Sequence, residues 1–269
     1  MMNEQTVTKM NELKLFGMAH SFAERIGKAD HSDLSHSEFV GLLIDDEKTH
    51  RENRKMDQLL KNAKLKIKEA CLEDIDYQYP RGISKQTILE FAQGAWLERK
   101  QNFLISGATG LGKTFISNAL GNQACRAGYS TLYVRIPRLF EQLHVAKADG
   151  THLNAIAKLS KINVLILDDF GFSPLTETER KDLLEIIEDR YHVGSVIMAS
   201  QHPLKEFHRL MGEPTIADAI CDRLFHNAYK LELKGDKSYR KEKSLPNRSQ
   251  FIGLDSVKNK ELKQKNCQQ

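Results

Sequence analysis

The chain has 269 residues, 40% of them hydrophobic and 28% charged, which is typical of a folded globular protein with one or two domains. Its formal net charge of +4 is small, so any affinity for nucleic acid must come from local basic patches. A polar N-terminus, no apolar stretch of membrane-spanning length, and four scattered cysteines without a CxxC pair predict a cytoplasmic protein with no membrane segment, disulfide framework or zinc site.

The first 70 residues predict a small all-helical domain that binds DNA or a protein partner. Apolar residues recur at helical spacing between Leu13 and Ile26, and a polar loop follows over residues 30–37. Ser35 and Glu38 then form a capping box that predicts the start of a second helix, which continues to Ala63. Basic residues gather in and after its second half: Arg51, Arg54, Lys55, Lys61, Lys64, Lys66 and Lys68. A solvated helix face and contact with the DNA backbone explain them equally well.

Residues 71–100 are expected to form a linker and a leading helix. The linker is acidic and aromatic, and it ends in the turn Pro80-Arg81-Gly82. A helix is then predicted from about Lys85 to Glu98. A segment placed just upstream of a nucleotide site can cover the base, for which Tyr77 or Ile83 are candidates, although ordinary packing explains both residues as well.

Residues 101–240 are expected to form a nucleotide-binding core built around a glycine-rich loop. The loop is Gly107-Ala108-Thr109-Gly110-Leu111-Gly112-Lys113-Thr114, between the apolar run Phe103–Ile105 and a helical pattern that ends at Arg126. Strand, glycine-rich turn and helix is the order of a P-loop, whose backbone N–H groups and helix dipole bind phosphate. Lys113 adds charge for the β- and γ-phosphates, and the Thr114 hydroxyl suits Mg²⁺. We therefore predict binding of a nucleoside triphosphate with Mg²⁺; a chance glycine loop is the alternative.

Two carboxylates follow the apolar strand Val164–Leu167. Because ligands of parallel sheets bind at the carboxyl ends of strands, Asp168 is expected to hold Mg²⁺ beside Thr114. Asp169 is expected to act as the general base that polarises the attacking water. A pair of aspartates can also simply open a turn, since Gly171 and Pro174 follow.

Two further polar residues are candidates for the same chemistry. Gln201, or Ser200 before it, follows the buried strand Val196–Ala199, so it can orient water or sense the γ-phosphate, or it is only a residue of the strand-end turn. Arg223 lies on an otherwise apolar helix between Glu213 and Ala228. It is either an arginine finger inserted into the site of a neighbouring subunit or the partner of Asp218, Asp222 or Glu213 in an ion pair.

Together these elements predict an α/β fold, a P-loop core with a parallel sheet flanked by helices. Thr131–Val134 and Tyr229–Leu233 supply further strands, and a capping box at Thr176 and Glu179 predicts another helix. Residues 241–269 are polar and rich in lysine, so a disordered tail is expected there.

The motifs taken together resemble one family. They are Leu15-Phe16-Gly17-Met18-Ala19, the P-loop, Ile166-Leu167-Asp168-Asp169-Phe170-Gly171, Ala199-Ser200-Gln201, and Gly212-Glu213-Pro214-Thr215-Ile216-Ala217-Asp218-Ala219-Ile220 with Asp222-Arg223-Leu224. The chain resembles the IstB-like transposition helpers, AAA+ ATPases related to DnaC-type helicase loaders, over roughly residues 13–240. The stretch before Asp-Arg-Leu is the specific part, and it favours the transposition helper over the loader.

The resemblance implies an ATPase that assembles on duplex DNA, largely without sequence preference, as a homo-oligomer in the form of a ring or a helical filament. It implies delivery of that DNA to the transposase of the same insertion element, with ATP hydrolysis remodelling the assembly. Lys113, Thr114, Asp168 and Asp169 take the ATPase roles, Gln201 the sensor position and Arg223 the finger position, while Arg240 is a doubtful second sensor because the lid is abbreviated. Asp169 stands where the superfamily commonly has Glu, so hydrolysis can be slow. A helicase loader, or a nucleotide-gated DNA-binding module with little hydrolysis, are the alternatives.

Overall fold

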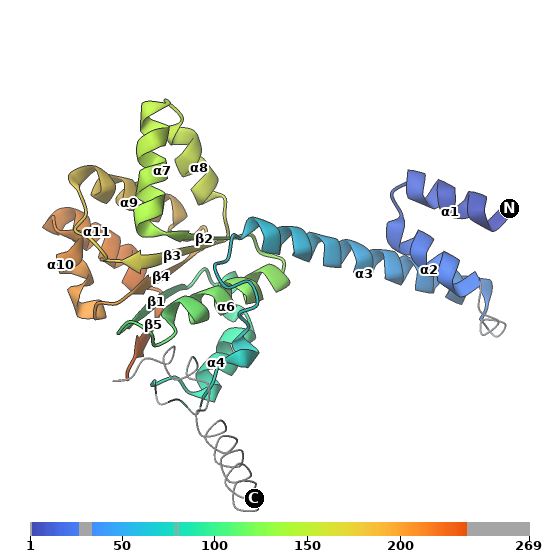
Figure 1. Cartoon of the computed structure of the whole chain (residues 1–269), viewed down its shortest axis with the longest axis horizontal. Helices are drawn as coiled ribbons and strands as arrows, with labels where there is room; N and C mark the ends of the chain where they lie inside the picture. The colour runs from blue at the N-terminus through green and yellow to red at the C-terminus, as the bar shows by residue number, and fades with distance from the viewer. Residues whose placement is uncertain (1, 27–33, 78, 80, 236–269) are drawn as a thin grey trace, which may run out of the picture.

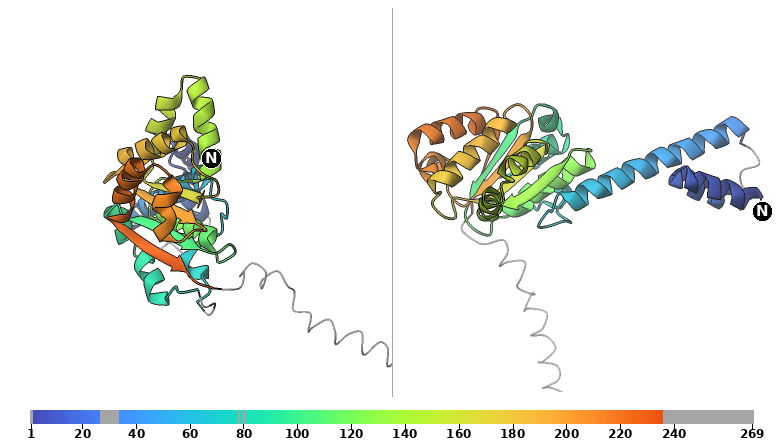
Figure 2. Two further views of the ribbon diagram at one scale, coloured as in Figure 1. Left: turned by 90° about the vertical axis from the view of Figure 1, so that its left-hand side faces the viewer. Right: turned by 90° about the horizontal axis from the view of Figure 1, so that it is seen from above.

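The computed structural model describes residues 2–26, 34–77, 79 and 81–235. It consists of a body of sheet and helices from which one long helix extends, with two shorter helices lying along the far part of that helix (Figures 1 and 2). We call these three helices the N-terminal arm: α1 (Met2–Glu12), α2 (Phe16–Ile26) and α3 (His36–Asn62). The expected disordered tail and Arg240 fall outside the described residues.

The helical character predicted for the N-terminal region is confirmed, with one difference. The helix expected from Leu13 begins only at Phe16, and a separate helix, α1, precedes it. The two are divided at Lys14, whose φ of 59° is left-handed. Helix α1 escaped prediction because its sequence is polar and carries little apolar periodicity. The capping box of α3 is present, since Ser35 Oγ accepts from Glu38 N and Glu38 Oε2 accepts from Ser35 N.

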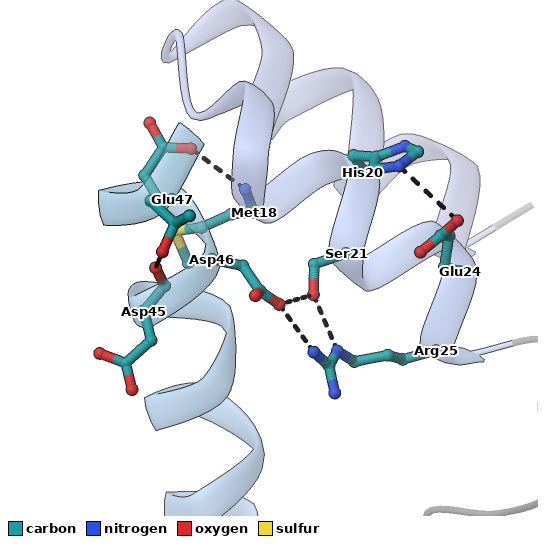
Figure 3. Close-up of polar contacts among 9 residues, drawn as sticks. Met18, His20, Ser21, Glu24, Arg25, Asp45, Asp46 and Glu47 are labelled. Atoms are coloured by element: carbon teal, nitrogen blue, oxygen red, sulfur yellow. Dashed lines mark hydrogen bonds and ion pairs between the residues drawn. The ribbon is translucent and has the colours of Figure 1, made fainter. Parts of the chain in front are cut away.

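Helix α2 is attached to α3 largely through two carboxylates of α3. Glu47 Oε2 accepts from the amides of Gly17 at 2.7 Å and Met18 at 3.1 Å, in the first turn of α2. Asp46 accepts from the Ser21 hydroxyl and from Arg25 (Figure 3). The helices cross closely, because a Cβ on Gly17 would lie 2.6 Å from His50 Cβ. The Glu47 carboxylate therefore accepts hydrogen bonds from two of the free N–H groups at the start of α2.

The chain between α3 and the sheet lies against the body. Asn118 Oδ1 accepts from Ile67 N, and Asn122 Nδ2 donates to Lys68 O, so this segment is bonded to the helix that follows the P-loop. A short 3₁₀ helix, η2 (Leu72–Asp74), comes next. The single helix predicted from Lys85 to Glu98 is wrong: the structure has α4 (Lys85–Ala92) and α5 (Ala95–Glu98), because Gly94 adopts a φ of 77° and interrupts the helix.

The centre of the body is a parallel sheet of five strands in the order β2-β3-β4-β1-β5. The strands are β1 (Asn102–Gly107), β2 (Thr131–Arg135), β3 (Val164–Phe170), β4 (Ser195–Ser200) and β5 (Ala228–Leu233). Their apolar runs are buried, as parallel strands covered on both faces require. Since all strands run the same way, their carboxyl ends meet along one edge. This confirms the predicted α/β class.

Two apolar cores separate the sheet from its covering helices. One lies under α6 (Lys113–Arg126) and the linker, and the other under the remaining helices (Figure 1). These are α7 (Ile136–Ala148), α8 (His152–Ser160), α9 (Glu177–Arg190), η3 (Leu204–Glu206), α10 (Phe207–Met211) and α11 (Pro214–Phe225). The capping box predicted for α9 is present at Thr176. Among the helices in the described ranges, none combines the length and apolar character needed to cross a bilayer.

Candidate nucleotide-binding site

The carboxyl ends of β1, β3 and β4 border a cavity of about 670 Å³. β4 lies between β1 and β3, so the loop after β1 and the acidic end of β3 face each other across the end of β4. The cavity is lined by predicted site residues from all three strands: Thr109, Gly110, Gly112, Lys113, Thr114, Asp169 and Gln201. Asp168 is only 1% exposed and lies behind Thr114.

The loop between β1 and α6 has the backbone shape of a phosphate cradle. Gly107, Gly110 and Gly112 have positive φ values of 145°, 92° and 93°. Gly107 also lacks room for a side chain, since a Cβ would lie 2.6 Å from Leu233 O at the end of β5. Lys113 folds back over this loop and donates to Gly107 O at 2.8 Å and Ala108 O at 3.0 Å. Burial lowers the pKa of Lys113, and the charges of Asp168 and Asp169 oppose that effect.

The first carboxylate of the acidic pair meets the P-loop hydroxyl directly. Asp168 Oδ2 accepts from Thr114 Oγ1 at 2.9 Å and from the Tyr133 hydroxyl at 2.8 Å. A hydroxyl and a carboxylate next to a phosphate cradle form a donor set of hard oxygens, so the residues fit a Mg²⁺-bound nucleoside triphosphate. Tyr133 was not anticipated. It lies on β2 and pairs with Ile166, two residues before Asp168, so both side chains are on the same face of the sheet.

The second carboxylate takes a different direction from the first. Asp169 has a φ of 62°, a left-handed conformation that is unusual for a residue other than glycine, and the pairing of β3 with β4 is irregular at this point. Its Oδ2 accepts from Arg135 Nε at 2.6 Å. Hydrogen bonding and charge from Asp169 raise the pKa of Arg135. The structure therefore brings Asp169 to the cavity but binds its carboxylate to an arginine at the end of β2.

The other two candidates are placed very differently. Gln201 Oε1 accepts from Thr109 Oγ1 at 3.4 Å, so the residue after β4 reaches the P-loop. Arg223 does not line the cavity. Its Nη2 forms an ion pair with Glu188 of α9 at 2.8 Å, and its Nη1 donates to Ala219 O.

The ion-pair partners suggested for Arg223 are therefore wrong. Glu213 caps α11 by accepting from Thr215 N and Ile216 N, and Asp218 pairs with His208. The Glu188 contact joins two helices that are distant in sequence, which local spacing does not reveal.

The chain between α3 and β1 supplies another part of the cavity wall: Lys66, Ile67, Asp74 and Arg81. The two candidates for covering a base, Tyr77 and Ile83, instead pack against the apolar core and are absent from the cavity lining. Sequence reasoning treated Arg81 only as part of a turn.

The parallel sheet, the glycine-rich loop before α6 and the Asp168–Thr114 contact define a P-loop nucleotide-binding fold. Residues 8–246 match the family described as IstB-like ATP binding protein. The chain belongs to this family.

Two bacterial relatives illustrate how far the similarity extends. A putative insertion sequence ATP-binding protein, y4pL of Sinorhizobium fredii, is 42% identical over 243 residues, 90% of this chain and 99% of the relative. The insertion sequence IS1162 putative ATP-binding protein of Pseudomonas fluorescens is 44% identical over 203 residues, 76% of this chain and 88% of its own.

Among solved structures, the similarity extends to the fold. The crystal structure of DnaI has a TM-score of 0.53 and 21% identity, covering 66% of this chain and 94% of DnaI. The replication initiator DnaA bound to AMPPCP and single-stranded DNA has a TM-score of 0.52 and 20% identity, covering 71% of this chain and 60% of DnaA.

Proposed function

We propose that this protein is an ATP-hydrolysing transposition helper, which assembles on duplex DNA and delivers it to the transposase of the same insertion element. The observation that carries the proposal is the contact between Thr114 and Asp168 at the P-loop, in a chain whose relatives are named as insertion-sequence ATP-binding proteins. The scattered cysteines, three of which (Cys71, Cys125 and Cys221) are free thiols in the described residues, fit a cytoplasmic location.

In the proposed reaction, each polar group at the sheet edge has one task. The loop amides and Lys113 bind the β- and γ-phosphates, while Thr114 and Asp168 hold Mg²⁺. The ion, when bound, neutralises charge that develops on the phosphates. Asp169 accepts a proton from the attacking water, and Gln201 orients that water. Because the Asp169 carboxylate is bonded to Arg135, Asp169 must release Arg135 before it can contact the water.

DNA binding is proposed for the basic part of α3 and the segment after it. Residues 51–68 contain seven lysines or arginines and two acidic residues. All seven basic residues are exposed. Contacts of this kind engage phosphates rather than bases, so we propose salt-sensitive binding with little sequence preference.

Assembly is proposed to involve Arg223 as a finger supplied to the adjoining subunit. A contact of this head-to-tail kind closes into a ring or continues as a helical filament. In the single chain Arg223 is bound to Glu188, so the finger role requires that this ion pair open on assembly. Mixing Arg223→Ala with Lys113→Ala protein should then restore part of the ATPase activity, because one intact finger can serve an intact P-loop.

Two alternatives have specific support. A helicase loader is the first, because the fold is also similar to that of the DnaC helicase loader, with a TM-score of 0.50 and 18% identity. The second alternative is a nucleotide-gated DNA-binding module with little hydrolysis. It is favoured by the Arg135–Asp169 ion pair, because Arg135 binds the carboxylate that is proposed to act as the general base.

The test is ATP turnover with and without duplex DNA, combined with co-purification against two partners. The helper requires turnover that rises with DNA, is lost in Lys113→Ala, and accompanies binding of the transposase of its own element. A flat, near-zero rate at saturating DNA supports the module, and retention of a replicative helicase in place of the transposase supports the loader. Asp169→Asn is expected to bind ATP but remain trapped on DNA.

A further inference from the structure

We propose that Arg81 is a positioning residue, which holds the P-loop in its phosphate-binding shape from the side of the linker. The proposal deepens the ATP-binding function and rests on it. Arg81 lies in the linker that precedes β1, 30 residues before the loop residue that it contacts. None of the roles assigned above includes it.

The guanidinium of Arg81 connects the loop to the linker. Arg81 is only 2% exposed, yet it borders the nucleotide cavity. Its Nη1 donates to Leu111 O at 3.2 Å, and its Nη2 donates to Asp76 O at 3.0 Å. A planar fork with donors in fixed directions can form both bonds at once, which a lysine ammonium on a flexible stem does less well.

The carbonyl that Arg81 binds, Leu111 O, lies in the part of the P-loop with left-handed backbone conformations. Leu111 stands between two glycines with left-handed φ values, 92° at Gly110 and 93° at Gly112. In a trans peptide the C=O and the next N–H point in opposite directions. Holding Leu111 O toward Arg81 therefore fixes the direction of the Gly112 N–H. Because such N–H groups bind phosphate in a glycine-rich loop, Arg81 sets part of the cradle.

The guanidinium also packs directly on the loop. A Cβ on Gly112 would lie 2.7 Å from Arg81 Nη1. The Arg81 backbone is anchored in turn, since Lys234 N donates to Arg81 O at 3.1 Å just after β5. The preceding residue, Leu233, crowds Gly107 at the other end of the loop. The chain after β5 thus supports both Arg81 and the first glycine of the cradle.

The test compares two substitutions of Arg81 with a matched buried arginine elsewhere. Arg81→Met removes the donors at similar length, and Arg81→Lys keeps the charge without the fork. The control is Arg190→Met. Arg190 is 1% exposed and donates to four backbone carbonyls (Leu159, Ile162, Asn163 and Ser195), but it does not line the nucleotide cavity. Fluorescence of the buried Trp96 reports folding in each variant.

We expect ATP affinity, measured with a fluorescent ATP analogue, to fall about tenfold in Arg81→Met and less in Arg81→Lys. In Arg81→Met without ATP, hydrogen exchange of the loop amides at 110–113 should be faster than in the wild-type protein. It should slow again when ATP binds. Arg190→Met should lower Tm while leaving ATP affinity within about twofold, because its bonds lie away from the loop.

Three outcomes would overturn the proposal: wild-type ATP affinity in folded Arg81→Met, wild-type affinity in Arg81→Lys if the methionine variant does not fold, or an equal loss of affinity in Arg190→Met. Failure of the ATP site itself would look different. In that case wild-type protein and Lys113→Ala would bind the nucleotide equally poorly.

Discussion

The edge of the sheet and the N-terminal arm use the same groups, carboxylates and backbone amides, in opposite surroundings. At the sheet edge Asp168 is 1% exposed, and its position follows from the parallel register of β2, β3 and β4. In the arm, Asp46 and Glu47 project from one helix to hold another; Glu47 is 6% exposed, but the Asp46 side chain is 41% exposed. The candidate nucleotide site is thus built on rigid neighbouring strands. The attachment of α2 to α3, in contrast, depends on a few side chains, each of which can be removed by a single substitution.

The largest expected effect is at the sheet edge. Lys113→Ala should weaken ATP binding by at least about thirtyfold, because a phosphate charge in a partly buried site loses its cation. Isothermal titration with Mg-ATP measures this. The arm should be unaffected, so amide exchange in α2 should match the wild-type protein. Unchanged ATP affinity would contradict the assigned role of Lys113.

A substitution at the crossing of α2 and α3 should detach the two helices without affecting the nucleotide site. In Gly17→Val the new Cβ would lie 2.8 Å from Asp46 O, a backbone atom that cannot move aside easily. We expect α2 to separate from α3 at a cost of about 1–3 kcal/mol, seen as faster amide exchange in α1 and α2 with unchanged ATP affinity.

Gly41→Ala is the matched control for the crossing. This glycine also lies in the arm, on α3, but a Cβ added to it would meet no atom of the described residues within 4 Å. Alanine should be neutral or stabilise α3 by up to about 1 kcal/mol through its helix propensity. If both glycine substitutions loosened α2 equally, close packing at Gly17 would not explain the attachment.

A smaller effect is expected where β2 supports Asp168, the carboxylate proposed to hold Mg²⁺. Tyr133→Phe removes one of two hydroxyl donors to Asp168 Oδ2 while keeping the ring in the core. Mg²⁺ dependence of ATP binding should shift by about three- to tenfold, since a single hydrogen bond of this kind contributes about 1 kcal/mol. Titration of Mg²⁺ at fixed ATP measures this shift; an unchanged midpoint would show that Asp168 is positioned without the Tyr133 hydroxyl.

The smallest effect is a pH dependence in the arm. Hydrogen bonds from Ser21 and then Arg25 hold the pKa of Asp46 below its ordinary value. Stabilisation by a carboxylate with a lowered pKa is complete above the unfolded pKa and is lost as the pH falls through the folded pKa. The amide signals of Ser21 and Arg25, the two residues of α2 that bind Asp46, should therefore report loosening only below about pH 4 when followed by NMR. In Asp46→Asn this acid response should be reduced; an identical response would assign it to other carboxylates.

Local patterns were enough to predict the parts of the site that are fixed by backbone. The P-loop, the strand before Asp168 and both capping boxes are determined by residues within a few positions of one another. The contacts that were missed join distant segments: Arg223 with Glu188, Tyr133 with Asp168, and Arg81 with Leu111. The break at Gly94 was missed for another reason, since a glycine inside a helical pattern does not reveal whether it will turn left-handed.

Tyr133 has a consequence that reaches beyond the nucleotide. Its amide donates to Ala63 O, directly after α3, while its hydroxyl donates to Asp168. One residue of an edge strand thus connects the Asp168 carboxylate to the end of a 27-residue helix about 40 Å long. Because of that length, a tilt of a few degrees at Ala63 would displace the far end of α3 by several ångströms.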